Sequence, residues 1–210
     1  YSIFNKEKDA INFLNEVNFP TVIKVDGLAA GKGVIIVNSK EEAVKNIKKI
    51  MSEKIFGTSG ENIIIEEFLE GEEISFFALV DANGFILPLT TAQDHKKIGD
   101  GDVGPNTGGM GAYSPVPFIQ YNQINDFVEK FVKPIINDLK NNNIFFSGVF
   151  YAGFILTKNG PKILEINVRF GDPEAQTIFP RLKTDLLELL FASSTGNLNQ
   201  FKSPKWENNF

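Results

Sequence analysis

The 210-residue sequence predicts an α+β fold of two lobes built on largely antiparallel sheets. Strand-like segments outnumber helical ones, and most of them come in pairs joined by short turns, which is typical of hairpins. A polar stretch near residues 93–122 also separates two groups of elements. We therefore expect one lobe over residues 1–92 and a second over residues 93–210.

In the first lobe, apolar residues at helical spacing predict a helix within residues 6–17. A strand at 22–25 should pair with a second strand at 34–38. Ser39 and Glu42 form a capping-box pattern, which predicts that the next helix begins there. Three further strands complete the lobe, at residues 62–68, 73–80 and 85–92.

In the second lobe, residues 93–117 form a connection with six glycines and three prolines. Its length indicates a functional segment rather than a simple link. The helix that follows carries an apolar stripe from Ile124 to Leu139, and Pro134 should kink or divide it. The last elements are a hairpin and a helix whose leucines should lie in the core, at residues 147–157, 162–168 and 184–192.

The overall composition excludes several classes of protein. A net charge of −5 argues against broad nucleic-acid binding, which needs a basic face. No apolar run approaches the roughly 20 residues that span a bilayer, and no secretory signal is visible. The lack of cysteine excludes disulfides and thiolate sites and agrees with the cytoplasmic location that we expect. The sequence leaves the oligomeric state open.

Two lysines flank a glycine-rich loop in the first lobe. Lys24 and Lys32 stand on either side of a turn whose glycines let backbone N–H groups approach an anion. The loop is not a Walker A motif, because Gly27 to Gly31 is one residue too short and Gly33 replaces the Ser/Thr. The pattern favours a polyphosphate grip; the alternative is a hairpin turn with surface lysines.

An apolar strand ends in a cluster of acids at residues 66–73. Backbone groups that leave a strand there can read the edge of an adenine, and Glu73 can accept hydrogen bonds from ribose hydroxyls. The alternative is a solvated acidic turn.

Glu165, Asn167 and Arg169 alternate along a strand and should therefore project to one face. The intervening apolar residues should face the core: Leu164, Ile166 and Val168. A carboxylate and an amide oxygen suit Mg²⁺, and the arginine can neutralise a transferring phosphoryl group. The alternative is an amphipathic edge strand with a polar outer face.

The long connection carries further polar candidates. Its glycines Gly108 and Gly109 would let the backbone fold tightly over a phosphate or carboxylate. His95 is the one histidine, and a structural role is the favoured interpretation for it. Without a second histidine or any cysteine, a hydrolase triad or a zinc site is not expected.

Four stretches together resemble the phosphoribosylamine–glycine ligase (glycinamide ribonucleotide synthetase) family: Ile23–Gly33, Glu66–Glu73, Gly104–Ala112 and Arg169–Glu174. The resemblance covers nearly the whole chain and corresponds to the central ATP-grasp portion of the family. It implies an ATP-grasp fold with the nucleotide cleft between the two lobes. We expect the flanking N- and C-terminal domains of the family to be absent from this chain.

The resemblance also implies an activity. The family ligates glycine to 5-phospho-β-D-ribosylamine in purine biosynthesis, with ATP as co-substrate and Mg²⁺ or Mn²⁺ as cofactor. The products are glycinamide ribonucleotide, ADP and phosphate, formed through a glycyl phosphate. The alternatives are another ATP-grasp carboxylate–amine ligase or carboxylase, or an ATP-binding fragment that catalyses nothing.

Site residues follow from the same resemblance. Those implied to bind ATP are Lys24, Gly31, Lys32, Gly33, Glu66, Glu67, Phe68, Leu69 and Glu73. The metal ligands would be Glu165 and Asn167, and Arg169 would face the γ-phosphate as the catalytic residue. Those implied for glycine and phosphoribosylamine are Asp94, Lys96, Asn106, Thr107, Gly108, Gly109 and Asp172. Many ATP-grasp enzymes carry a further acid on the preceding strand, where this sequence has Gly153.

Overall fold

The structure is a computed structural model that describes residues 1–29, 32–101 and 103–207. The chain forms two compact units, Tyr1–Leu69 and Glu70–Phe210. The boundary that we expected after residue 92 is wrong, because the strands at 72–80 and 86–94 pair within the sheet of the second unit.

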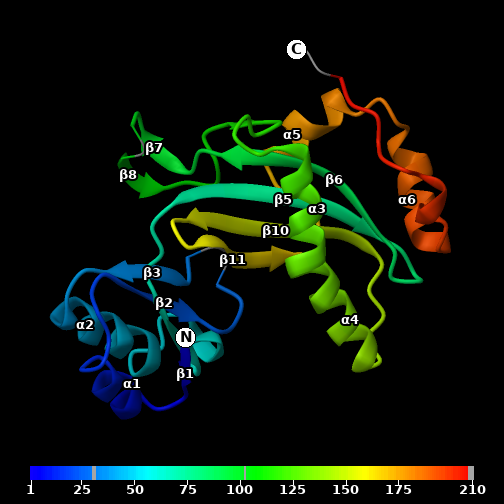
Figure 1. Ribbon diagram of the computed structural model, residues 1–210. Coiled ribbons are helices and arrows are strands. Elements are labelled where there is room, and N and C mark those ends of the chain that lie inside the picture. The colour runs from blue at the N-terminus through cyan, green and yellow to red at the C-terminus, as the bar shows by residue number, and fades with distance from the viewer. Residues whose placement is uncertain (30–31, 102, 208–210) are drawn as a thin grey trace. The chain divides into compact units, whose positions relative to one another are not determined.

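The first unit is a four-stranded antiparallel sheet with the order β1-β4-β2-β3 (Figure 1). Its strands are β1 (Ser2–Phe4), β2 (Thr21–Val25), β3 (Val34–Val37) and β4 (Ile63–Glu67). Helices α1 (Glu7–Phe13) and α2 (Lys40–Met51) cover one face, and a short helix η1 (Gly57–Gly60) precedes β4. The core lies between helices and sheet, where Ala10, Ile47 and Ile63 are fully buried.

The start of α2 follows the predicted capping pattern with one difference. The backbone N–H of Glu42 donates to the Ser39 hydroxyl at 3.2 Å. The Glu42 carboxylate accepts from the N–H of Asn38 at 2.8 Å, one residue earlier than in the usual box.

The second unit is a five-stranded antiparallel sheet with the order β11-β10-β5-β6-β9. Its strands are β5 (Glu72–Val80), β6 (Ile86–Asp94), β9 (Ala112–Tyr113), β10 (Gly148–Thr157) and β11 (Gly160–Asn167). A separate hairpin joins β7 (Lys97–Gly99) to β8 (Val103–Asn106). The segment predicted as an irregular connection therefore contains three short strands, β7, β8 and β9.

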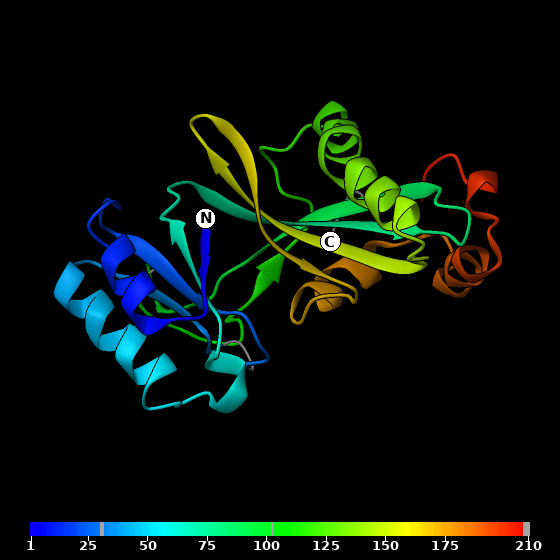
Figure 2. The ribbon, with the colours of Figure 1, turned by 90° about the horizontal axis from the view of Figure 1, so that it is seen from below.

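Helices cover both faces of this sheet (Figure 2). On one face run α3 (Tyr121–Phe127), the π-helical segment η2 (Val128–Val132) and α4 (Lys133–Asn141). On the other lie α5 (Glu174–Ile178), η3 (Phe179–Arg181), α6 (Leu186–Thr195) and η4 (Leu198–Gln200). The central strand β5 is consequently buried on both sides, with Phe76 in one core cluster and Phe77 in the other.

Two helices differ in detail from the prediction. The helix around Pro134 continues without a break, but it is not a regular α-helix, because the π-helical segment η2 ends shortly before the proline. Proline has no backbone N–H to donate to the carbonyl oxygen four residues earlier. In α6, Leu189 is buried, but Leu187 is 75% exposed and Leu190 is also exposed. Consecutive leucines on a helix that packs by one face cannot all reach the core.

No helix within the described ranges is both long and apolar enough to cross a membrane.

Candidate functional site

Four strands of the second unit bring one row of residues together across the sheet. Glu165 of β11 pairs with Gly153 of β10, and Gly153 pairs with Ser75 of β5. Ser75 in turn pairs with Ala92 of β6. Because residues directly opposite each other in an antiparallel sheet share a face, Glu165 points to the same side as Ser75.

A second row lies one step along this face. Asn167 pairs with Tyr151, and Tyr151 pairs with Phe77. Since every second residue of a strand returns to the same face, Glu165 and Asn167 lie side by side on it. The structure thus brings a carboxylate and an amide oxygen to one face of an edge strand, where a hard metal ion can be bound.

Gly153 leaves the space that Glu165 occupies. A Cβ atom at position 153 would lie 3.1 Å from the Cγ of Glu165, closer than an ordinary contact. A larger side chain there would push against Glu165.

The apolar residues in the second half of β11 and directly after it do not all pack as we predicted. Three of them were expected in the core, namely Leu164, Ile166 and Val168. Instead, Ile166 is 43% exposed and Val168 is 70% exposed. The pairing shifts between Gly153 and Phe154, so that Phe154 faces Ile163, and Ile163 packs against the core. The bulge and the edge position of β11 therefore override the simple alternation.

Arg169 and Asp172 follow the end of β11, and both are exposed. The guanidinium of Arg169 donates to the carbonyl oxygen of Phe170 at 2.9 Å. The carboxylate of Asp172 accepts from the amide of Gln176 at 2.7 Å. Both charged groups are thus held by neighbours in sequence and remain accessible to a ligand.

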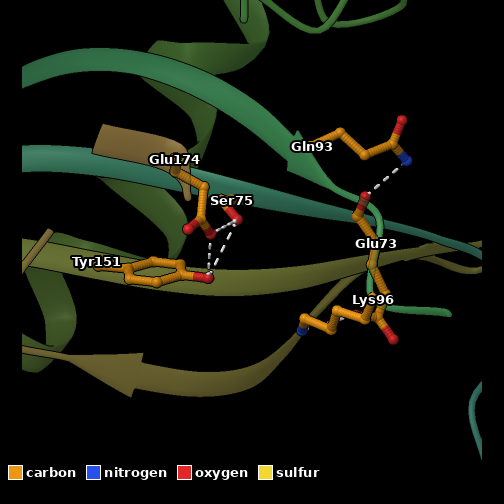
Figure 3. A network of polar contacts seen from close by, with 6 residues as sticks. All are labelled: Glu73, Ser75, Gln93, Lys96, Tyr151 and Glu174. Atoms are coloured by element: carbon orange, nitrogen blue, oxygen red, sulfur yellow. Dashed lines mark hydrogen bonds and ion pairs between the residues drawn. The ribbon is translucent and has the colours of Figure 1, made fainter. Parts of the chain in front are cut away.

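Lys96 and Glu73 form an ion pair, with 3.2 Å between Nζ and Oε2 (Figure 3). The side-chain amide of Gln93 donates to the carbonyl oxygen of Glu73 at 2.9 Å. Burial by itself would lower the pKa of Lys96, but the charges of Glu73 and Glu165 outweigh it and the pKa is raised. Lys96 is therefore a firmly charged cation close to a predicted metal ligand.

Asp94, two residues after Ala92 on β6, offers an acceptor with no partner. Its Oδ1 is buried and makes no hydrogen bond within the described ranges. Burial raises the pKa of Asp94, and the charge of Glu174 raises it further. A Cβ atom at Gly109 would lie 3.1 Å from this oxygen and 2.5 Å from Cδ of Pro173, so the Gly109 backbone lies close to both the oxygen and the proline ring. Such an oxygen suits a small cationic donor.

The loop that carries Gly109 is tied to the end of β6. The N–H and the hydroxyl of Thr107 both donate to the carbonyl oxygen of Lys96, at 2.6 and 2.9 Å. The Gly109 N–H donates to the Thr107 hydroxyl at 3.1 Å. Gly108 is exposed between them, and Asn106 ends β8, its side chain lying outside the described part.

Sequence reasoning missed a buried group at the centre of this face. The carboxylate of Glu174 accepts hydrogen bonds from the hydroxyls of Ser75 and Tyr151, each at 2.8 Å (Figure 3). Burial raises the pKa of Tyr151 far above its usual range, and the Glu174 carboxylate adds to the shift, so the phenol keeps its proton. Ser75 and Tyr151, each within an otherwise apolar strand, could have indicated such a group, because buried hydroxyls need hydrogen-bond partners.

In the first unit, Lys24 and Glu66 form an ion pair, with 2.7 Å between Nζ and Oε2. Both lie on the sheet face opposite the helices, as their register with Ile64 and Val22 indicates. Exposed apolar side chains share that face, namely Ile3, Val34 and Ile36. After this pair the chain passes through exposed Glu67 and half-buried Phe68 and Leu69 into the second unit.

The glycine-rich loop of the first unit is compact where it is described. A Cβ atom at Gly27 would fall 2.5 Å from the Cα of Ser59, and one at Gly33 would fall 2.7 Å from the Cβ of Ala29. Lys32 is exposed beside Gly33. Gly31, which we predicted to bind phosphate, lies outside the described residues.

Comparison with known proteins shows which family the chain belongs to. The family described as phosphoribosylglycinamide synthetase, ATP-grasp (A) domain, matches residues 1–175. The chain belongs to that family. A phosphoribosylamine–glycine ligase of Caldanaerobacter subterraneus subsp. tengcongensis is 47% identical over 207 residues, which are 99% of this chain and 49% of that protein. The chain therefore spans about half the length of the curated relative it matches.

Solved structures agree on the ATP-grasp fold. Phosphoribosylamine–glycine ligase from Thermotoga maritima matches with a TM-score of 0.87 at 30% identity, over 97% of this chain and 51% of that one. The biotin carboxylase domain of a Hydrogenobacter thermophilus 2-oxoglutarate carboxylase, in complex with MgADP and bicarbonate, matches with a TM-score of 0.73. That match covers 98% of this chain and 43% of the other at 17% identity, which shows the fold alone. This chain is thus an ATP-grasp domain with antiparallel sheets in both units, as the sequence predicts.

Proposed function

We propose that the protein carrying this ATP-grasp domain ligates glycine to 5-phospho-β-D-ribosylamine, forming glycinamide ribonucleotide in purine biosynthesis. ATP would be converted to ADP and phosphate. The observation that carries the proposal is the pairing that sets Glu165 and Asn167 on one sheet face, directly before Arg169, in a chain of this family. The lack of cysteine agrees with the reducing cytoplasm as the site of the reaction.

We assign the first unit to nucleotide binding as the smaller lobe. The Lys24–Glu66 pair is partly exposed and therefore weak, so phosphate oxygens can replace the carboxylate as partner of the ammonium. Lys32 and the glycine loop would add charge and backbone N–H donors. The open apolar face beside Lys24 suits a planar base, and the backbone from Glu66 to Leu69 would read its edge.

The second unit would hold the metal and the terminal phosphate. Glu165 and Asn167 supply two hard oxygens, and the described residues contain no cluster of three or more acids or histidines that could hold a metal. Two protein ligands completed by phosphate oxygens and water suit Mg²⁺, and Mn²⁺ can use the same donors. The ion would neutralise charge on the phosphates. Glu73 would accept hydrogen bonds from the ribose hydroxyls, and Lys96 would hold it in place through their ion pair.

The chemistry needs positioned charge rather than a nucleophilic side chain. A glycine carboxylate oxygen attacks the γ-phosphorus, ADP leaves, and Arg169 stabilises the charge on the transferring phosphoryl group. The amine of phosphoribosylamine then attacks the acyl carbon of glycyl phosphate and expels phosphate. The unpartnered oxygen of Asp94 would bind the glycine ammonium. The remaining substrate contacts would come from Lys96, Asn106, Thr107, Gly108, Gly109 and Asp172.

Substrate dependence tests this function in the full-length protein. ADP release should require both glycine and phosphoribosylamine and should not respond to bicarbonate, which a carboxylase would use. Glu165→Ala and Arg169→Ala should each lower kcat well over tenfold, consistent with a loss of about 2 kcal/mol or more of transition-state stabilisation. Lys158→Ala, in the turn between β10 and β11, is the matched control and should leave kcat unchanged. ADP release without glycine, or normal turnover in either site variant, would contradict the proposal.

A further inference from the structure

Glu174 is a buried carboxylate that the proposed reaction does not use. It is 2% exposed, and its Oε1 receives the hydroxyls of Ser75 and Tyr151. The two hydroxyl oxygens are also 3.1 Å apart. Burying a carboxylate is costly, and an apolar side chain could fill such a site at least as stably. Stability of the core therefore does not account for an acid here.

The two donors belong to the rows that carry the metal-ligand candidates. Tyr151 pairs directly with Asn167, and Ser75 pairs with Gly153, which pairs with Glu165. A bond from Glu174 to both hydroxyls thus fastens it to the same part of the sheet that positions these two ligands.

At its other end, Glu174 holds the turn that follows β11. A Cβ atom at Gly171 would lie 2.1 Å from Oε2 of Glu174, so the turn backbone lies directly on the carboxylate. The N–H of Ala175 donates to the carbonyl oxygen of Gly171 at 3.0 Å. The ring of Phe170 stacks on Phe77 with 6.0 Å between centroids. The turn is therefore folded around Glu174.

We propose that Glu174 is a positioning residue whose buried carboxylate, fixed by Ser75 and Tyr151, holds the turn at residues 169–173 so that Arg169 stays aligned with Glu165 and Asn167. Arg169 itself is exposed and bonds only to its neighbouring carbonyl among the hydrogen bonds seen in the described ranges. The turn backbone therefore sets the position from which its side chain extends. The inference rests on the proposed function, in which Arg169 acts on the transferring phosphoryl group.

The test uses the full-length protein with Glu174→Gln, which keeps the size of the side chain and removes its charge. We expect kcat to fall about tenfold while KM for ATP stays within about twofold, because the turn matters mainly in the transition state. Amide hydrogen exchange, measured without substrates, should accelerate in the peptide over residues 170–178. Tyr151→Phe removes one donor and should lower kcat about threefold.

Asp81→Asn is the matched control, because Asp81 is an equally buried carboxylate at the other end of β5. It should lower the melting temperature without changing kcat or exchange at 170–178. The inference is overturned if Glu174→Gln keeps wild-type kcat, or if exchange at 170–178 is unchanged. If Glu174→Gln does not fold, Tyr151→Phe decides by the same two measurements. A wild-type protein that releases no glycine-dependent ADP refutes the proposed function, and the exchange result then decides the inference alone.

Discussion

Gly153→Ala tests the geometry of the metal-ligand candidates with a single added methyl group. The new Cβ would lie 3.1 Å from the Cγ of Glu165, whereas ordinary contacts begin at 3.4 Å. Glu165 must therefore move by a few tenths of an ångström. A functional group tolerates displacement of only about 0.5 Å before its action suffers. The expected displacement of Glu165 is therefore comparable to the largest that metal binding tolerates.

The same substitution should leave the fold intact. Gly153 has no positive φ angle, so alanine fits its backbone. Alanine stabilises by about 0.4–1 kcal/mol through the unfolded chain. The crowding is relieved toward solvent, because the Glu165 side chain is exposed on an edge strand. We expect the free energy of unfolding to change by less than about 1 kcal/mol.

The assay is ADP release as a function of Mg²⁺ concentration, alongside urea unfolding. The Mg²⁺ concentration for half-maximal activity should rise about fivefold, equivalent to about 1 kcal/mol of lost metal binding. Ala152→Gly is the control, because Ala152 is the next residue on β10 but packs in the opposite core. It should cost stability and leave the Mg²⁺ requirement alone. An unchanged Mg²⁺ requirement in a folded Gly153→Ala protein would refute the reasoning about this row.

Three further substitutions probe other contacts. Burial raises the pKa of Asp94 in the folded protein. The protonated carboxyl therefore contributes its full stability below the pKa of the unfolded chain, about 3.9, and this stability is lost as pH rises through the pKa of the folded protein. Asp94→Asn should therefore be more stable than wild type in urea unfolding at pH 8 but not at pH 3. The Oδ2 of Asp81 accepts a hydrogen bond from the Leu198 N–H at 3.2 Å. Asp81→Asn would place an amide N–H against that donor, so it should lower the free energy of unfolding by about 1–2 kcal/mol. Gly109→Ala should lose about 1 kcal/mol or more in chemical denaturation and lower kcat, since φ is +124° and Cβ would meet Pro173 at 2.5 Å.

Much of this fold was predictable because its elements are local. The hairpin between β10 and β11 follows from alternating residues and a turn, and the start of α2 follows from Ser39 and Glu42. The alternation of Glu165 and Asn167 on one face is a local property too, and the pairing retains it.

The errors arise where distant parts of the chain decide. The bulge between Gly153 and Phe154 turns Ile163 toward the core, although the simple alternation predicts its neighbour Leu164 there. The division after Leu69 depends on the pairing of β5 with β10. This pairing joins residues that are distant in the sequence, such as Ser75 and Gly153. Hydrophobic patterning in one segment carries no information about such partners.

The Glu174 network also combines elements that are fixed locally with contacts between distant parts of the chain. Strands hold Glu165 and Asn167 by their ladder of hydrogen bonds, and such positions are precise. Arg169 lies past the end of the ladder, so its position depends on a turn, and turns need separate anchors. A buried acid that bridges 99 residues to Ser75 and 23 residues to Tyr151 is such an anchor. Substitutions in the anchor should therefore affect the phosphoryl-transfer step, whereas substitutions in the ladder should affect metal binding first, and kcat and the Mg²⁺ requirement separate the two.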